Sequence, residues 1–380
     1  MRQQAQLGAV FAVMGGASAA LPATIPMRAN QLGIPLTQLM PSIPTLFFGL
    51  ALGIAFTPLI SKVLSTSNHV RSSIALQTIG VLGIGFFDSQ QLFIASALII
   101  GFGFGQLEVL ITSIARVQTE HVGNLLTRLG IYLASAAFLT PIAIIGLDLI
   151  GASKVIYLMI ASVSLYLVIS FKTGQIYTES KNLLVLKLAN VKVYLLVLAI
   201  TFYVGAETIL AGWSAVLFSE NISDNLVSAP LGTSIFWAGM TLGRVVGTFV
   251  SSKNFTAKAT ATLWSLGLSI SLLFLSRITQ EASQAAFLLT LVTAIFFAGP
   301  CYGFIIGFAV SIYEQSLAIK SAAFFVLIGS FGGVMVPGLA QIFLGSDSKG
   351  IILGAAIAAT LSTLFLILSF RETAPKYPQS

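Results

Sequence analysis

GFGFGQLEVLITSIAR, residues 101–116, is a glycine-rich, apolar stretch that carries one acid, Glu108, well inside it. The 380-residue chain around it is 56% hydrophobic and 8% charged, with a mean hydropathy of +0.96. Soluble domains contain about 25% charged residues, so this chain cannot build a water-facing surface. Its 28 phenylalanines and 34 glycines suit membrane helices, in which small residues let backbones approach closely. Lipid is therefore the predicted solvent, and Glu108 lies inside a membrane segment.

Apolar runs that can cross the bilayer recur along the whole chain. Crossing about 30 Å of hydrocarbon takes about 20 residues. Twelve runs fit, the third short and the tenth long enough to be tilted or kinked: 5–25, 39–61, 72–88, 91–115, 127–147, 152–171, 192–218, 229–251, 259–276, 283–311, 321–344 and 350–370. The longest polar break, 172–191, is too short for a soluble domain. The sequence predicts an all-α integral membrane protein with twelve transmembrane helices.

The distribution of basic residues predicts the orientation of these helices. Fourteen Lys and Arg residues fall on the side of the N-terminus, against four on the other side, Arg28, Lys154, Arg277 and Lys349. Because cytoplasmic loops are enriched in Lys and Arg, both termini are predicted to be cytoplasmic, in a protein of the cytoplasmic (inner) membrane. An alternative is that residues 7–14 and the following GGASAALPA form a cleaved signal peptide, which would leave eleven helices.

The two halves of the chain resemble each other. GLALG at 49–53 precedes Lys62, and GMTLG at 239–243 precedes Lys253, at an offset of 190 residues. Gly15 and Gly205 share that offset, and Pro141 answers Pro337 at 196. These matches favour a duplicated six-helix unit, with a bundle at 1–171, a cytoplasmic linker at 172–191 and a second bundle at 192–380. In such duplicated carriers the substrate site lies near mid-membrane between the halves.

Several motifs resemble those of the major facilitator superfamily and, within it, the fucose-permease-like branch of sugar and small-solute transporters. GFGFGQLE (101–108) is similar to that branch's glycine-rich segment ending in a buried Glu, and YVGAETILAGW (203–213) to its G-x-E…G-W segment. FWAGMTLGR (236–244) is similar to the W-x-G-x-x-x-G-R pattern, the second-half version of the cytoplasmic gating motif. AGPCYGF (298–304) and GSFGGVMVPG (329–338) are also typical. The resemblance covers essentially the whole chain and implies two pseudo-symmetric six-helix bundles.

Two features depart from the family pattern. The superfamily's first gating loop carries an Asp with basic residues, whereas residues 54–71 hold only Lys62 and Arg71. Fucose-permease relatives have an acid in the first helix that takes part in proton coupling, whereas this region reads GGASAALP (15–22). Proton coupling therefore does not carry over from that relative as a whole. Lys62, Arg71, Arg116 and Arg244 are the predicted gating residues.

Glu108, Glu207 and Arg244 are charged residues that lie well inside the predicted spans, away from their ends. At 1.5 Å per residue, Glu108 lies about 24 Å from the outer end of its helix, Glu207 is nearly central and Arg244 is in the inner half. A charged side chain at such a depth costs about 2.5–3.5 kcal/mol, which a glutamate avoids by staying protonated. A protonated glutamate that faces a water-accessible cavity can release its proton when the cavity opens. Glu108 and Glu207 are therefore candidates for proton coupling or substrate binding.

Each of these residues has an alternative interpretation. Glu108 can be a hydrogen-bonded helix contact, although Thr112 and Arg116 follow at i+4 and i+8 and give one helix face a polar line. Glu207, close to Gly205 and Gly212, can cap a break in its helix. Arg244 can be a gate, a helix tether or a substrate ligand.

Further candidates for a substrate cavity share polar or aromatic side chains within the predicted spans: Gln77, Gln106, Thr112, Tyr132, Tyr203, Trp213, Trp237, Thr241 and Tyr302. The same side chains also pack between helices or sit at membrane interfaces, so packing remains the alternative. His69 and His121 fall in inner loops and are expected to be solvated. The sequence has no metal-ligand spacing, Walker loop or nucleophile motif. We therefore predict no bound metal or cofactor and no enzymatic activity.

The sequence thus predicts a monomeric secondary active transporter that moves a small polar, sugar-like solute by alternating access. Protons are the predicted coupling ion and sodium the alternative. The alternative function is an exporter of drugs, siderophores or other amphipathic metabolites, favoured by the phenylalanine content and the missing first-helix acid. Nucleic acid is not a predicted partner, because no basic cluster with interleaved aromatics occurs. A membrane enzyme or receptor would need a catalytic cluster or an output domain, and the sequence shows neither.

Overall fold

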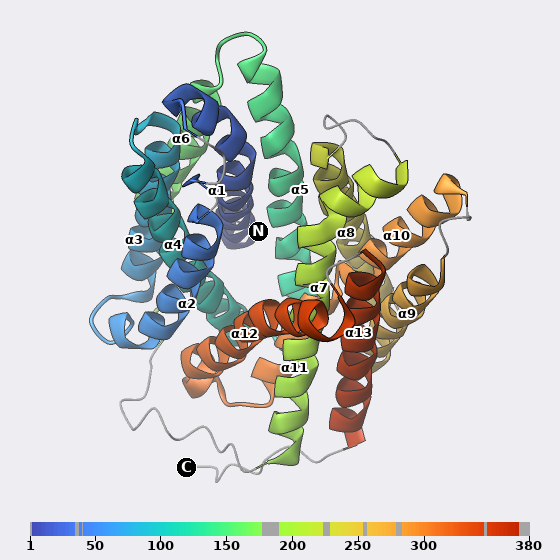
Figure 1. Ribbon diagram of the computed structural model, residues 1–380. Helices are drawn as coiled ribbons and strands as arrows, with labels where there is room; N and C mark the ends of the chain where they lie inside the picture. The colour runs from blue at the N-terminus through green and yellow to red at the C-terminus, as the bar shows by residue number, and fades with distance from the viewer. Residues whose placement is uncertain are drawn as a thin grey trace. The chain divides into compact units, whose positions relative to one another are not determined.

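A computed structural model describes residues 2–34, 38–39, 41–176, 190–222, 229–253, 257–278, 283–345 and 348–371 of the chain. Every regular element in these ranges is helical. The predicted linker, 172–191, lies mostly outside them. The helices, labelled in Figure 1, are α1 (Arg2–Leu32), α2 (Ser42–Ile60), α3 (Thr66–Phe86), α4 (Gln90–Gln118), α5 (Val122–Asp148), α6 (Lys154–Ser170), α7 (Val191–Ile222), α8 (Ala229–Lys253), α9 (Ala257–Arg277), α10 (Gln284–Ala298), α11 (Cys301–Ser311), α12 (Ala318–Leu344) and α13 (Ser348–Arg371).

Each predicted span corresponds to a helix, except that the tenth is divided into α10 and α11. The division falls at Gly299 and Pro300, where proline lacks the N–H that a continuous helix needs and restricts the residue before it. Among the described residues, eight helical stretches are long and apolar enough to cross a membrane, and Thr45–Ile60 and Lys154–Ser170 are shorter apolar helices. The predicted all-α, twelve-span fold is confirmed, with the tenth span kinked.

The outer surface of the helices is apolar. Phe343, Ile169 and Leu289 expose 76%, 71% and 70% of their surface. Many buried hydroxyls bond within their own helices, as where Thr57 Oγ1 donates to the Gly53 carbonyl at 2.7 Å. This pattern suits hydrocarbon, which offers no partner to a stray polar group.

Two compact units make up the chain. Unit 1 contains residues 1–114 and 132–180, and unit 2 contains residues 115–131 and 181–380. Within unit 1, α3 packs against α6 and α1. Within unit 2, α7 packs against α12, α13 and α8, and α9 packs against α13 and α10 (Figure 1). The end of α4 and the start of α5, residues 115–131, thus belong to unit 2, and we call this stretch the junction segment. The bundle boundaries drawn from the sequence remain a prediction.

Glycine pairs let helices approach backbone to backbone in both units. In unit 1, Gly53 of α2 lies so close to Phe102 of α4 that a Cβ would come within 2.9 Å of the Phe102 carbonyl carbon. In unit 2, a Cβ at Gly243 of α8 would come within 2.9 Å of the Phe296 carbonyl carbon of α10. These glycines are 190 residues apart, so the positions matched in the sequence have the same packing role. Close backbone contact of this kind is a principal source of helix association in membranes.

Candidate functional site

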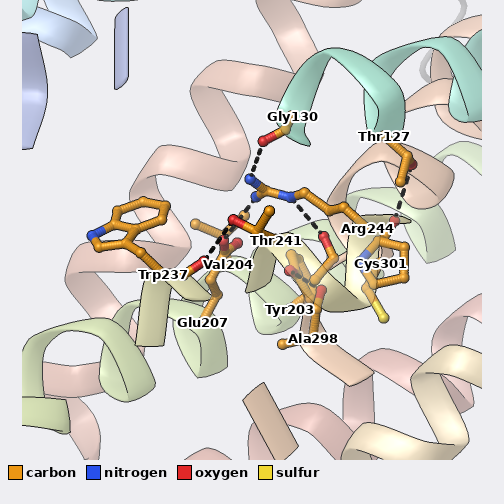
Figure 2. A network of polar contacts seen from close by, with 12 residues as sticks. Thr127, Gly130, Tyr203, Val204, Glu207, Trp237, Thr241, Arg244, Ala298 and Cys301 are labelled. Carbon is orange, nitrogen blue, oxygen red and sulfur yellow. Dashed lines mark hydrogen bonds and ion pairs between the residues drawn. The ribbon is translucent and has the colours of Figure 1, made fainter. Parts of the chain in front are cut away.

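Arg244 of α8 lies at the centre of a polar network inside unit 2 (Figure 2). Its Nε donates to the Gly299 carbonyl at 2.9 Å, and its Nη1 donates to the Gly130 carbonyl of α5 at 2.7 Å. Glycine at both acceptors leaves space for this approach, since a Cβ at Gly130 would lie 3.1 Å from the Arg244 Cδ and Nε. Arg244 thereby ties α8 to the end of α10 and to the junction segment.

The break between α10 and α11 supplies the acceptors of this network. Where a helix stops, its last carbonyls lose their helical partners, and inside a membrane they need others. Three consecutive carbonyls receive side chains from three helices. Tyr203 Oη of α7 donates to the Ala298 carbonyl at 2.8 Å, and Arg244 bonds Gly299. The Pro300 carbonyl accepts the first backbone bond of α11, from Phe304 at 3.2 Å, and also has Thr127 Oγ1 of α5 at 3.5 Å. The network is therefore built on a helix break that the Gly-Pro pair creates.

Glu207 of α7 stands beside Arg244 without a close hydrogen bond to it. Its Oε1 is 3.9 Å from the Arg244 Nη2, and the Glu207 side chain is 20% exposed against 9% for Arg244. Tyr203, one turn earlier on α7, shares the same face and has its ring centroid 6.5 Å from that of Tyr302 on α11. The pair is largely desolvated, and Glu207 retains some access to its surroundings.

Two more predicted residues lie on the Arg244 face of α8. Trp237 and Thr241 precede Arg244 by seven and three residues, which places all three on one side of the helix (Figure 2). Both are half-buried, and Thr241 Oγ1 donates to the Trp237 carbonyl at 2.8 Å. Unit 2 thus brings together Tyr203, Glu207, Trp237, Thr241, Arg244 and Tyr302. Trp213, farther along α7, is also half-buried.

The remaining cavity candidates are in unit 1. Gln106 of α4 is buried and accepts from Ser73 Oγ of α3 at 2.7 Å. Gln77 and Thr112 are buried as well, whereas Tyr132 is 51% exposed. The bond to Ser73 favours the packing interpretation of Gln106, whereas both amide atoms of Gln77 are buried without a hydrogen-bond partner, and the roles of Gln77 and Thr112 remain predictions. Glu108 is half-buried on α4, and its role in coupling remains a prediction.

Two of the predicted gating arginines cap helix ends. Arg71 Nε donates to the Phe171 carbonyl, just after α6, at 2.9 Å. Arg116, in the junction segment, donates to the carbonyls of Tyr313 at 2.6 Å and Val310 at 3.2 Å, at the end of α11. Basic side chains stabilise helix C-termini in this way. Lys62 is exposed.

His69 differs from its expected environment. The sequence suggested a solvated side chain, but His69 lies in the first turn of α3 and is fully buried, whereas His121 is exposed as expected. Its Nδ1 lies 3.0 Å from Ser61 Oγ, and burial lowers the pKa of the imidazole to about 4. His69 precedes the predicted span 72–88, so a residue assigned to a loop instead packs at the start of a helix.

Sequence reasoning missed the backbone acceptors of the network. Gly130 has no side chain and contributes only a carbonyl, so no motif identifies it. The pair Gly299–Pro300 is a signal that could have located the helix break, but the partners of the carbonyls around that break depend on the packing of α5, α7 and α8.

Comparisons with known proteins give the fold a name. No family model matches the chain. The curated "Bypass of stop codon protein 6" of Saccharomyces cerevisiae is 27% identical over 161 residues, which are 41% of this chain and only 32% of that protein. A structure of a variant of the E. coli fucose:proton symporter FucP matches with a TM-score of 0.77 and 17% identity over 97% of this chain and 98% of that one.

Two further solved structures match over nearly the full length. The proton:xylose symporter XylE has a TM-score of 0.78 and 15% identity, covering 97% of this chain and 95% of that one. The human organic anion transporter MFSD10 has a TM-score of 0.76 and 13% identity, covering 96% and 99%. The chain therefore has the major facilitator superfamily fold. The resemblance to that superfamily is confirmed at the level of fold, and the fucose:proton symporter is among the structures that share this fold.

Proposed function

We propose that the chain is a secondary active carrier that moves a small polar, sugar-like solute by alternating access, driven by protons. The observation that carries the proposal is a partly accessible carboxyl group, Glu207, 3.9 Å from a guanidinium that is anchored on two backbone carbonyls inside a helix bundle. Ionisable residues at membrane depth are costly and are usually functional.

Two carboxyl groups are available for proton coupling. Glu207 belongs to unit 2 and Glu108 to unit 1. Structures of the same fold include two described as proton symporters, which supports protons over sodium as the coupling ion. The carrier is proposed to act as a monomer in the cytoplasmic membrane with both termini inside.

Reconstitution tests this proposal. A thermal-shift screen of the purified protein against sugars, amino sugars, polyols and siderophores first identifies the solute, because a ligand that binds the folded state raises its stability. Proteoliposomes with an imposed pH gradient should then accumulate that solute.

Replacing each buried glutamate with glutamine tests which carboxyl group carries the coupled proton. Glu207→Gln or Glu108→Gln should abolish gradient-driven accumulation and spare solute exchange. Glu314→Gln, which changes an exposed acid outside the spans, should leave both unchanged. Normal accumulation in both buried-acid variants would refute the proton role.

An exporter of amphipathic compounds is the second candidate. The acid-free sequence of the membrane-buried part of α1 favours it, because the first-helix acid of fucose-permease relatives is missing. Two results would favour the exporter over the sugar carrier. Siderophores or drugs would bind instead of sugars in the thermal screen, and the bound compound would not move out of vesicles whose inside is acidic.

A further inference from the structure

Two lysines lie against a pair of stacked phenylalanines at one end of unit 2. Phe308, near the end of α11, and Phe370, near the end of α13, have ring centroids 4.9 Å apart in an edge-to-face arrangement. Lys192 Nζ lies 5.2 Å from the Phe308 centroid, and Lys258 Nζ lies 5.7 Å from the Phe370 centroid. An ammonium group within about 6 Å of a ring centroid is attracted to the ring. Arg371 adds a third positive charge at the end of α13, and we call these five residues the basic–aromatic cluster.

The helix ends at this cluster add positive potential. Lys192 and Lys258 are the second residues of α7 and α9, and neither helix has an acid in its first turn. A helix N-terminus carries a partial positive charge, so it favours acids and disfavours lysine. Neither Lys258 nor Arg371 forms an ion pair with another described residue, and Glu372 lies outside the described ranges. The described part of the cluster is therefore a place where an anion is favoured.

An apolar, lipid-facing surface leads directly to the cluster. Ile357, Leu364 and Arg371 follow each other at steps of seven residues on one face of α13, and all three are exposed. At 1.5 Å per residue, Arg371 lies about 10 Å beyond Leu364 along the helix. On α9, the exposed Leu263 follows Lys258 by five residues. A molecule with an apolar chain against these leucines would have its head group beside Lys258 and Arg371.

We infer that the basic–aromatic cluster binds the phosphate group of an anionic glycerophospholipid from the surrounding bilayer. Lys258 and Arg371 are exposed and can donate to the phosphate, since a contact with a ring leaves the N–H groups of an ammonium available. Lys192 is 6% exposed and adds charge from behind Phe308. Basic pockets between membrane helices bind anionic head groups, and the cluster is on the side that the sequence predicts to be cytoplasmic, where the leaflet is negatively charged.

The aromatic rings have a defined part in this site. Lysine and arginine side chains lose conformational freedom when they bind a ligand, which lowers affinity. Because Phe370 already holds the Lys258 ammonium in place and precedes Arg371 in the chain, less freedom remains to be lost. The bound lipid would join the ends of α9 and α13, which also pack against each other within unit 2.

Native mass spectrometry of the purified full chain tests the inference. The protein in detergent is titrated with phosphatidylglycerol, which is anionic, and with phosphatidylcholine, which has no net charge. The test variant is Lys258→Gln/Arg371→Gln. Its matched control is Lys154→Gln/Arg277→Gln, because Lys154 Nζ also lies over a ring, 5.4 Å from the Phe86 centroid, and Arg277 also ends a helix. Both double variants lose one lysine and one arginine from exposed positions.

The unmodified protein should bind phosphatidylglycerol more tightly than phosphatidylcholine. Each Lys or Arg near an anionic head group is worth about fivefold in affinity, so Lys258→Gln/Arg371→Gln should bind phosphatidylglycerol at least tenfold more weakly. The control variant should stay within about twofold of its parent. Equal loss in the two double variants, or equal affinity of the unmodified protein for the two lipids, would overturn the inference.

Two further measurements test the ring and the lipid separately. Phe370→Leu keeps every charge but removes the ring under Lys258, so it should weaken phosphatidylglycerol binding, and Phe370→Tyr should restore it. Unchanged binding in a monodisperse Phe370→Leu protein would contradict the role of the ring. Glycerol 3-phosphate carries the same phosphate chemistry without acyl chains, so a large excess should leave the lipid bound. Displacement at concentrations similar to that of the lipid would assign the site to a soluble anion instead.

Discussion

Gly53 and Gly243 provide a quantitative test of the duplicated packing. At each position a Cβ would approach the facing carbonyl carbon, of Phe102 or Phe296, to 2.9 Å, where ordinary contact begins at about 3.4 Å. The two helices must therefore separate by at least about 0.5 Å, and by more at the carbonyl oxygen, because backbone on both sides cannot rotate away. Such overpacking costs about 1–3 kcal/mol. We expect Gly53→Ala and Gly243→Ala each to lower the free energy of unfolding by about that amount.

The measurement is thermal unfolding of purified protein in one detergent, with Gly338→Ala as the matched control. Gly338 is also helical, but a Cβ there would meet nothing within 4 Å. Since alanine is a better helix former than glycine by about 1 kcal/mol, the control should be neutral or stabilising. If Gly53→Ala or Gly243→Ala unfolds at the same temperature as the Gly338→Ala control, close backbone contact does not hold that helix pair together. A large difference in unfolding temperature between Gly53→Ala and Gly243→Ala would disprove that the two glycines have the same packing role.

Three further predictions follow from single contacts. Tyr203→Phe keeps the ring but leaves the Ala298 carbonyl unpaired, so it should cost about 1 kcal/mol of unfolding free energy, and unchanged chemical denaturation would contradict it. Arg28 is buried and bonds the Phe87 carbonyl, whereas its partner Asp88 is 79% exposed, so Arg28→Met should cost about 2 kcal/mol and Asp88→Asn less than about 1 kcal/mol in the same assay. His69 has a folded pKa of about 4, below its unfolded value, so its stabilising effect is complete above about pH 6.5 and is lost as the pH falls toward 4. From pH 7.5 to 5.5 the protein should lose about 1 kcal/mol through this residue, and a His69→Gln variant that shows the same loss would refute the assignment.

Much of the fold follows from the order of residue types along the chain. The spans were predictable because lipid requires long apolar helices with internally bonded backbones. A tilt or kink in the tenth span was predicted from its length, and Pro300, which cannot continue the hydrogen-bond ladder, fixes where the kink falls. His69 was misplaced because a polar residue near a turn looks the same in sequence whether it faces water or packs beside Ser61.

The candidate site was only partly predictable. Glu207 and Arg244 stood out as charges in apolar runs, a signal that needs no neighbours. Their positions in the chain do not reveal that the two side chains lie 3.9 Å apart. Nor do they reveal that Arg244 bonds a carbonyl of α5. Gln77 and Gln106 were predicted to line a cavity; both side chains are buried in the structure, and their roles stay predictions.

The sequence by itself determined the solvent, the number of membrane spans and the identity of the buried charges, because each depends on local composition or periodicity. Only the tertiary structure decided which carbonyls Arg244 bonds and that the start of α5 packs within unit 2. Those contacts join residues more than 100 positions apart, and a backbone carbonyl carries no mark in the sequence until a neighbouring helix approaches it.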